Sequence, residues 1–139
     1  LTADCIPLLV TDKLGTFIGC IHAGWRGLKL NIIEKFFDNI FFSKYSDLKV
    51  LIGPSISRDM YEVDSDILRS FPGHTSHFKQ NKSGKYNMDI KNIAYDILRK
   101  IGITDVTISP ACTCKDNRLF SYRKNKITGR FISLIWFKR

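Results

Sequence analysis

Alternating stretches of apolar and polar residues at the start of the chain predict a β-hairpin. Apolar residues dominate 6–10 and 16–21, and the residues between them, Thr11-Asp12-Lys13-Leu14-Gly15, have the composition of a turn. A turn centred between Lys13 and Leu14 pairs Cys5 with His22. Directly opposed residues on antiparallel strands have Cβ atoms about 4.5–5.5 Å apart. We therefore expect a thiol and an imidazole to lie side by side at the open end of this hairpin.

The remaining pattern predicts a mixture of helices and strands. Apolar residues recur at helical spacing in 29–42 and again in 90–101, where Asp89 is a plausible N-cap and Gly102 fits the position after the C-cap. Asp64 also suits the start of a short helix that runs to Phe71. Strands are expected at 48–52, 106–109 and 130–137, the last with both faces partly covered. A mobile loop is expected at 72–85 and irregular structure at 112–123. This order indicates an α/β (α+β) fold.

Length and composition define the class of protein. The chain has 139 residues, 44% of them hydrophobic and 25% charged, which is typical of one globular domain. It has neither an apolar run long enough to span a bilayer nor a signal-peptide pattern, so we expect a cytoplasmic protein with reduced cysteines and no membrane partner. Because Leu1 immediately precedes a strand with site residues, we expect 1–139 to be the C-terminal part of a longer domain whose N-terminal portion is missing.

The net charge of +9 raises the question of nucleic-acid binding. Lysine and arginine are scattered along the chain, and most aromatic residues occupy positions expected in the core. A solvated basic surface is the simpler interpretation, and we expect no specific nucleic-acid partner. A positive field also favours a small anionic substrate such as phosphate.

Cys5 and His22 are the first candidate metal ligands. One sulfur and one imidazole nitrogen bind zinc at about 2.3 and 2.0 Å, but a catalytic zinc takes three protein ligands plus water. The third ligand must therefore come from elsewhere. His74 and His77 are the only other histidines, and the pair Cys112-Thr113-Cys114 is a further possibility. The alternative is that Cys5 is a small buried apolar residue and His22 a structural one.

Other motifs suit anion and base recognition. Gly24-Trp25-Arg26-Gly27 precedes a helix whose first N–H groups attract anions, and Arg26 adds a planar donor fork. Asp4 is a candidate proton acceptor, with a structural hydrogen bond at the strand end as the alternative. Tyr122 and Arg123, in Phe120-Ser121-Tyr122-Arg123, can stack on a base and contact an anion, or form a basic turn with Gly129-Arg130.

Together these phrases resemble a known family. Thr-Ala-Asp-Cys-x-Pro (2–7), His-Ala-Gly-Trp-Arg-Gly (22–27) and Gly-Pro-Ser-Ile-Ser (53–57) are followed by Tyr-Glu-Val (61–63), Cys-Thr (112–113), Phe-Ser-Tyr-Arg (120–123) and a Thr-Gly-Arg…Ser-Leu-Ile-Trp segment (128–136). In this respect the chain is similar, nearly end to end, to the YfiH-like purine nucleoside phosphorylases, also named multi-copper polyphenol oxidoreductase, laccase domain. The resemblance implies mixed β-sheets in a sandwich-like core flanked by helices, as in bacterial deamidase toxins.

The resemblance also implies chemistry. It implies a zinc ion held by two histidines and one cysteine, of which Cys5 and His22 match two, with the remaining histidine upstream of Leu1. The implied substrates are phosphate and the nucleosides adenosine, inosine and 5′-methylthioadenosine, cleaved to base and ribose 1-phosphate, with adenosine deamination as a further activity. For this reaction we assign catalytic roles to Asp4 and Arg26 and substrate binding to Tyr122 and Arg123.

Three alternatives remain open at this point. A Cys-His hydrolase would use Cys5 as its nucleophile, a basic domain would bind nucleic acid, and an inactive truncated remnant would do neither. A copper laccase is improbable because three histidines cannot supply the imidazoles of a multicopper oxidase.

Overall fold

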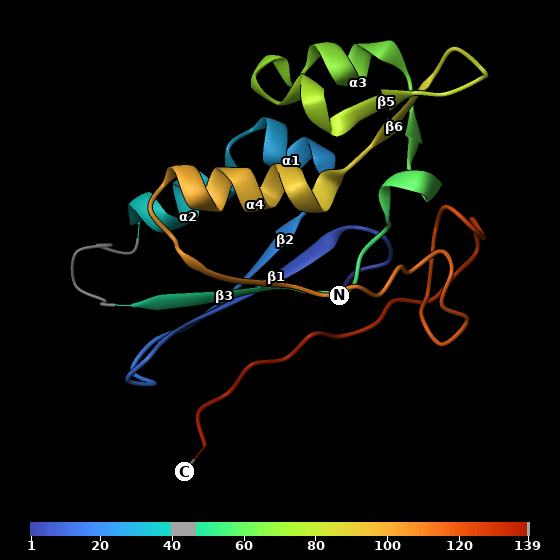
Figure 1. The fold of residues 1–139 in the computed structure, drawn as a ribbon. Coiled ribbons are helices and arrows are strands. Elements are labelled where there is room, and N and C mark those ends of the chain that lie inside the picture. The colour runs from blue at the N-terminus through green and yellow to red at the C-terminus, as the bar shows by residue number, and fades with distance from the viewer. Residues whose placement is uncertain (40–46, 139) are drawn as a thin grey trace.

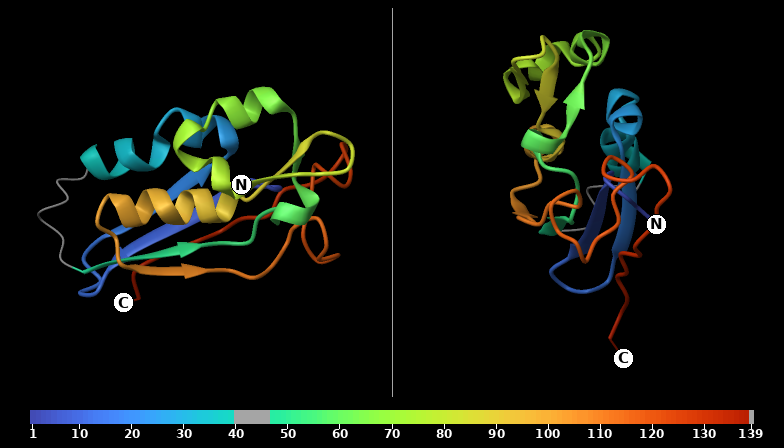
Figure 2. Two further views of the ribbon diagram at one scale, coloured as in Figure 1. Left: turned by 45° about the horizontal axis from the view of Figure 1, so that its top comes forward. Right: turned by 90° about the vertical axis from the view of Figure 1, so that its right-hand side faces the viewer.

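A mixed four-stranded sheet forms the centre of the molecule. The structure, a computed structural model, describes residues 1–39 and 47–138. The strands β1 (Ile6–Asp12), β2 (Ile18–Ala23), β3 (Leu48–Ile52) and β7 (Asp105–Ile108) lie in the order β2-β1-β3-β7. β1 is antiparallel to β2 and β3, while β3 and β7 are parallel. Helices α1, α2 and α4 lie on one face of this sheet (Figures 1 and 2).

The predicted hairpin is present, but its register differs from the expected one. Pro7, not Cys5, pairs with His22, and Thr11 pairs with Ile18, so the turn is centred between Leu14 and Gly15. The carboxylate of Asp12 accepts hydrogen bonds from the backbone N–H groups of Thr16, at 2.7 Å, and Phe17, at 3.0 Å. These bonds place Thr16 and Phe17 in the turn. The prediction that Cys5 lies directly opposite His22 is therefore wrong.

The first helical region begins earlier than expected and is broken. It consists of α1 (Trp25–Lys29) and α2 (Ile32–Asn39), where the sequence predicts one helix over 29–42. Asn31 has a φ of 59°, in the left-handed region, which interrupts the helix between the two parts. Ile33 and Phe37 of α2 are buried against the sheet. The predicted end at 40–42 lies outside the described residues.

Helix α4 (Ile90–Lys100) agrees with the prediction at both ends. The Asp89 side chain accepts a hydrogen bond from the Asn92 N–H, at 3.2 Å, as an N-cap should. At the other end Gly102 has a φ of 94°, and the Ile103 N–H donates to the Leu98 carbonyl at 3.0 Å. This is the Schellman arrangement that ends helices. The apolar stripe of α4 is buried on the sheet and includes Ile90, Ile93, Ala94, Ile97 and Leu98.

A second, three-stranded sheet includes part of the segment 72–85, where a loop was expected: 72–77 form the short helix η3 and 78–80 the strand β5. Strands β4 (Glu62–Val63), β5 (Phe78–Gln80) and β6 (Tyr86–Met88) lie in the order β4-β6-β5, all antiparallel. The short helices η2 (Arg58–Met60), α3 (Ser65–Arg69) and η3 (Pro72–His77) surround it. The Gly- and Ser-rich composition suggested a loop, whereas the buried side chains of Phe71 and Met88 hold the segment against the core.

The C-terminal part of the chain is largely irregular. Residues 112–123 lack regular strands, as predicted, but 130–137 forms only an isolated bridge between Phe131 and Thr2. Alternate side chains of this segment are exposed, among them Ile132, Leu134 and Trp136. The prediction of a strand with both faces covered is therefore wrong for this segment. Within the part of the chain that the structure describes, no helix is long and apolar enough to cross a membrane.

Candidate functional site

Cys5 and His22 line one cavity at the end of the hairpin. The cavity has a volume of about 440 Å³ and is lined by Cys5, His22, Gly24, Trp25, Arg26 and Gly27. Because His22 pairs with Pro7, Cys5 and His22 are diagonal neighbours rather than opposite ones. Diagonal neighbours on antiparallel strands are about 7–8 Å apart, within reach of long side chains. The two side chains therefore face the same cavity even though the predicted register was wrong.

The electrostatic environment keeps the two groups neutral when no ion is bound. Burial raises the pKa of the Cys5 thiol, and the neighbouring Asp4 carboxylate raises it further, against the lowering effects of Arg130 and Arg26. Burial also lowers the pKa of His22, with a contribution from the N-terminal amine. A neutral imidazole is the form that binds metals, whereas a thiol must lose its proton to do so.

The backbone after His22 turns directly into α1. Gly24 is the N-cap of this helix, with an extended φ of −87° and no side-chain cap, and the Leu28 N–H donates to the Gly24 carbonyl at 2.9 Å. The guanidinium of Arg26 is stacked on the Trp25 ring, with Cζ 4.4 Å from the ring centroid. This contact holds an exposed arginine at the rim of the cavity.

Asp4, near the N-terminus, forms hydrogen bonds with two residues of the C-terminal part of the chain. It has a φ of 86°, and its carboxylate accepts hydrogen bonds at 2.7 Å from the Thr113 hydroxyl and from the Arg123 backbone N–H. Thr113 is fully buried. Both carboxylate oxygens of Asp4 are thus engaged in structural hydrogen bonds, the alternative role considered for this residue.

Arg123 and Tyr61 are in contact with each other, and Tyr61 is close enough to Cys5 to be influenced by its charge. Arg123 donates from Nη1 to the Glu62 carbonyl at 2.7 Å, and its guanidinium lies over the Tyr61 ring, 5.2 Å from the centroid. Burial, followed by the influence of Cys5, raises the pKa of Tyr61 to about 12. Tyr61 was missed as a site residue. The Tyr-Glu-Val phrase of the family resemblance is the one signal in the sequence that pointed to it.

The other predicted residues do not line this cavity. The ring of Tyr122 is exposed and stacked against Lys126, whose Nζ is 4.3 Å from the ring centroid. Cys112 and Cys114 are buried, and the Ser57 hydroxyl donates to the Cys112 sulfur at 2.9 Å. His74 and His77 form a separate cluster with Asp96. Within the described ranges, no third histidine, cysteine or carboxylate joins Cys5 and His22 in a group of three.

With this geometry in place, sequence comparison identifies the class of protein. The family described as multi-copper polyphenol oxidoreductase laccase matches residues 1–138, and the chain belongs to this family. Its relatives include a purine nucleoside phosphorylase YfiH from Shigella flexneri, 33% identical over 98% of this chain, and a purine nucleoside phosphorylase from Pseudomonas aeruginosa, 33% identical over 99% of it. The resemblance to YfiH-like proteins is confirmed.

Solved structures confirm the fold class. A Neisseria meningitidis protein superposes with a TM-score of 0.81 at 32% identity over 89% of this chain. YfiH from Bacillus licheniformis superposes with a TM-score of 0.82 at 27% identity over 90% of it. The mixed α/β fold with two sheets and flanking helices is that of these proteins.

The chain spans little more than half the length of the relatives that it matches. It covers 57% of the Shigella flexneri protein, 59% of the Pseudomonas aeruginosa protein and 53% of the Neisseria meningitidis structure.

Proposed function

We propose that this chain carries part of the active site of a purine nucleoside phosphorylase. The reaction is phosphorolysis of adenosine, inosine and 5′-methylthioadenosine to the free base and a ribose 1-phosphate. The observation that carries the proposal is that Cys5, His22 and Arg26 line one and the same cavity of about 440 Å³. The names of the relatives, and their identity over nearly the whole chain, support the same activity.

Cys5 and His22 are two ligands of a zinc ion in this proposal. The donor set fits, because zinc prefers thiolate and imidazole. The fit also accounts for a half-buried thiol beside a carboxylate, since a bound cation would offset the effects that raise the Cys5 pKa. When bound, zinc supplies Lewis acidity toward substrate oxygens or a bound water. We propose that the third protein ligand lies outside these 139 residues, in a preceding part of a longer domain.

Arg26 binds and orients phosphate in this proposal. Its guanidinium presents two parallel N–H donors to phosphate oxygens, and its stacking on Trp25 limits the orientations it adopts. Orientation matters because phosphorolysis needs the phosphate oxygen held in line with the bond to the base. The positive charge of Arg26 also stabilises the anionic nucleophile at the mouth of the cavity.

Arg123 and Tyr122 bind the nucleoside in this proposal, and the structure favours adding Tyr61. The Tyr61 ring is stacked under Arg123 and is electrostatically coupled to Cys5. Its raised pKa means that it keeps its proton and can donate a hydrogen bond. Asp4 acts by holding the Arg123 backbone through its carboxylate, so its effect on catalysis is mainly one of position.

Adenosine deamination is a second reaction that the same centre can support. A zinc ion held by Cys5, His22 and a third ligand would supply the Lewis acidity that deamination at the purine C6 requires, with water as the nucleophile and ammonia as the leaving group. Inosine formed from adenosine would then itself be a substrate for phosphorolysis. The two reactions are separated by their phosphate requirement.

A Cys-His hydrolase is the less favoured alternative. Its nucleophile would have to be a thiolate with a lowered pKa. Burial and Asp4 instead raise the pKa of Cys5. A copper laccase is not proposed either: among the three histidines, His74 and His77 lie on η3, away from the cavity lined by His22.

The deciding experiment measures phosphate-dependent release of base from the three nucleosides. It is run on this chain and on the chain with its preceding residues restored, each with Cys5→Ala and His22→Ala variants. We expect release by the restored chain and its loss, by at least about a hundredfold, in both variants. Cys20→Ala is a matched control, because Cys20 is an exposed cysteine on β2 outside this cavity.

Three outcomes would contradict the proposal. Release that persists in both variants would exclude the role given to Cys5 and His22. Release that is independent of phosphate would indicate hydrolysis. Absence of release from the restored chain would favour an inactive remnant.

A further inference from the structure

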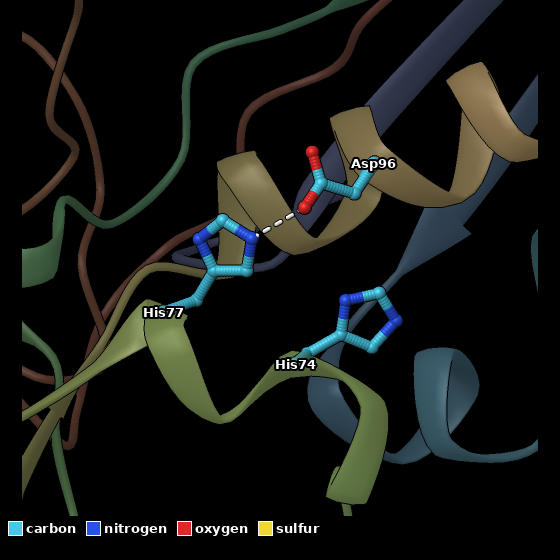
Figure 3. Close-up of side chains that lie close together, drawn as sticks. All are labelled: His74, His77 and Asp96. Atoms are coloured by element: carbon cyan, nitrogen blue, oxygen red, sulfur yellow. Dashed lines mark hydrogen bonds and ion pairs between the residues drawn. The ribbon is translucent and has the colours of Figure 1, made fainter.

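A second cluster of metal-binding side chains lies between η3 and α4. His74 and His77 come from η3 and Asp96 from α4, and their candidate ligand atoms all lie within 4.8 Å of one another. Figure 3 shows both imidazoles directed from η3 toward the helix that carries Asp96. None of the three lines the cavity that contains Cys5 and His22.

The three side chains are already partly ordered. His77 Nε2 and the Asp96 carboxylate are 2.6 Å apart, and the His77 side chain is only 16% exposed. The two imidazole rings lie 6.1 Å apart, centroid to centroid, with a tilt of 32°. His74 lies at a kink in η3, with a φ of −132°, and its N–H donates to the carbonyl of the buried Phe71 at 3.0 Å. The His77 carbonyl accepts a hydrogen bond from the Asp89 N–H at 2.8 Å. An ion would therefore find its ligands close together before it binds.

The distances fit a transition metal after a small adjustment. Ligands about 2.0–2.1 Å from a tetrahedral ion are about 3.3 Å from each other. The His77–Asp96 contact of 2.6 Å must widen to reach this value, and the longest separation, up to 4.8 Å, must shorten. Asp96 is 47% exposed and on the solvent side of α4, so its side chain can rotate without disturbing the core.

The surrounding charges favour a cation. Burial and the neighbouring His77 lower the pKa of His74, against the raising effects of Asp96 and Glu34 and together with a lowering effect of Lys100. Glu34, on α2, has one carboxylate oxygen that is buried and makes no hydrogen bond with any residue that the structure describes. The Asp96 and Glu34 carboxylates both act on His74 as negative charges, which favours a cation at the cluster.

We propose that His74, His77 and Asp96 form a binding site for a divalent transition-metal ion of the zinc class. Two imidazoles and one carboxylate are a donor set that such ions accept, with the remaining positions left to water. The ion ties η3 to α4 and thereby fastens the three-stranded sheet to the central one. This site is independent of the zinc site in the proposed function, because the two share no ligand.

The test uses the chain with Cys5→Ala and His22→Ala, which removes the other candidate site. Cobalt(II) is the optical probe, and zinc is titrated by calorimetry and by thermal unfolding. We expect one cobalt ion with visible d–d bands and without a sulfur-to-cobalt charge-transfer band, because the ligands are nitrogen and oxygen. We also expect zinc to raise the unfolding temperature, as any ligand selective for the folded state does.

Substitutions of the proposed ligands test which side chains bind the ion. His74→Gln and Asp96→Asn are each expected to weaken cobalt binding at least tenfold. Both positions are partly or largely exposed, so the fold should persist, which circular dichroism will check. Asp66→Asn is the matched control, since Asp66 is an exposed carboxylate on α3 outside the cluster. It is expected to leave binding unchanged.

Three results would overturn the proposal. They are the absence of cobalt binding, equal binding in His74→Gln and the parent, and a charge-transfer band that shows cysteine ligation. Failure of the proposed function is read separately, from phosphorolysis by the chain with Cys5 and His22 intact. The proposed metal site and the proposed function can therefore fail independently of each other.

Discussion

The sulfur of Cys5 occupies the space beside Gly24 that a side chain there would need. A β-carbon placed on Gly24 would lie 2.8 Å from the Cys5 Sγ, closer than such atoms pack. Extending the β1–β2 register by one pair places these two residues opposite each other. The absence of a side chain at 24 therefore determines where the thiol sits relative to His22.

Gly24→Ala is expected to displace the Cys5 thiol and to lower kcat/KM for phosphorolysis by about tenfold or more, which corresponds to about 1.4 kcal/mol of transition-state stabilisation. Zinc affinity should fall with it. Gly73→Ala is the control, because the space around Gly73 is open and its φ is not in the left-handed region. Both variants are made in the chain with its preceding residues restored, and steady-state kinetics of phosphorolysis decide the matter. Equal activity in Gly24→Ala and the parent would show that the position of the thiol is unimportant.

Asp12 is expected to stabilise the hairpin in a pH-dependent way. The Thr16 hydroxyl, and then the Phe17 and Thr16 N–H groups, lower the pKa of Asp12 against the raising effect of burial. A pKa that is lower in the folded state than the usual value of about 3.9 contributes stability above that value, and the contribution is lost as the pH falls through the folded pKa. Asp12→Ala should therefore unfold at a lower temperature at neutral pH, with a difference that shrinks on acidification.

Thermal unfolding followed by circular dichroism between about pH 2 and pH 7 measures this difference. Asp105→Ala serves as the comparison, because Asp105 forms an exposed ion pair with Lys49 and such pairs contribute little. A difference for Asp12→Ala that stayed constant, or grew toward low pH, would contradict the assignment.

Local signals explain why α4 could be predicted and the hairpin register could not. In α4 the apolar stripe, the cap at Asp89 and the glycine at 102 are read from neighbouring positions, and all three agree. The register of the hairpin depends on which N–H groups the Asp12 side chain reaches, which is a matter of turn geometry. Composition indicates only that a turn is present.

In the candidate site, too, the residues that local sequence predicts differ from those that only the three-dimensional packing reveals. Cys5, His22 and Arg26 were found because they lie close together in the sequence and on one hairpin. Tyr61 and Asp96 were not singled out, because each is brought to its cluster by tertiary packing. Asp96 is on the polar face of a helix, where a carboxylate ordinarily indicates no more than a solvated surface.

The hydrogen bond between Thr113 and Asp4 is expected to support both stability and substrate binding. Thr113→Val removes the hydroxyl but keeps the shape of a fully buried side chain, so one Asp4 oxygen loses its partner. Such a loss costs about 1–3 kcal/mol. Because the other Asp4 oxygen holds the Arg123 backbone, the KM for nucleoside should rise more than kcat falls.

Thr113→Ser retains the hydroxyl and should restore most of the KM. Urea unfolding gives the stability of each variant, and initial rates at saturating phosphate give the two kinetic constants. A fall in kcat with an unchanged KM would instead indicate that Asp4 takes part in the chemical step, the role first assigned to it.

Under the proposed function, Arg26 is expected to determine the affinity for phosphate of the chain with its preceding residues restored. Arg26→Ala should raise the KM for phosphate at least tenfold while changing the KM for nucleoside much less, because the guanidinium is assigned to the anion and not to the base. Arg26→Lys should recover only part of the loss, since an ammonium lacks the planar fork and its stacking on Trp25. Lys29→Ala, which removes an exposed positive charge from the same helix, controls for the general field. If Arg26→Ala and Lys29→Ala changed the phosphate KM equally, the positive surface would suffice to attract phosphate and Arg26 would have no specific role.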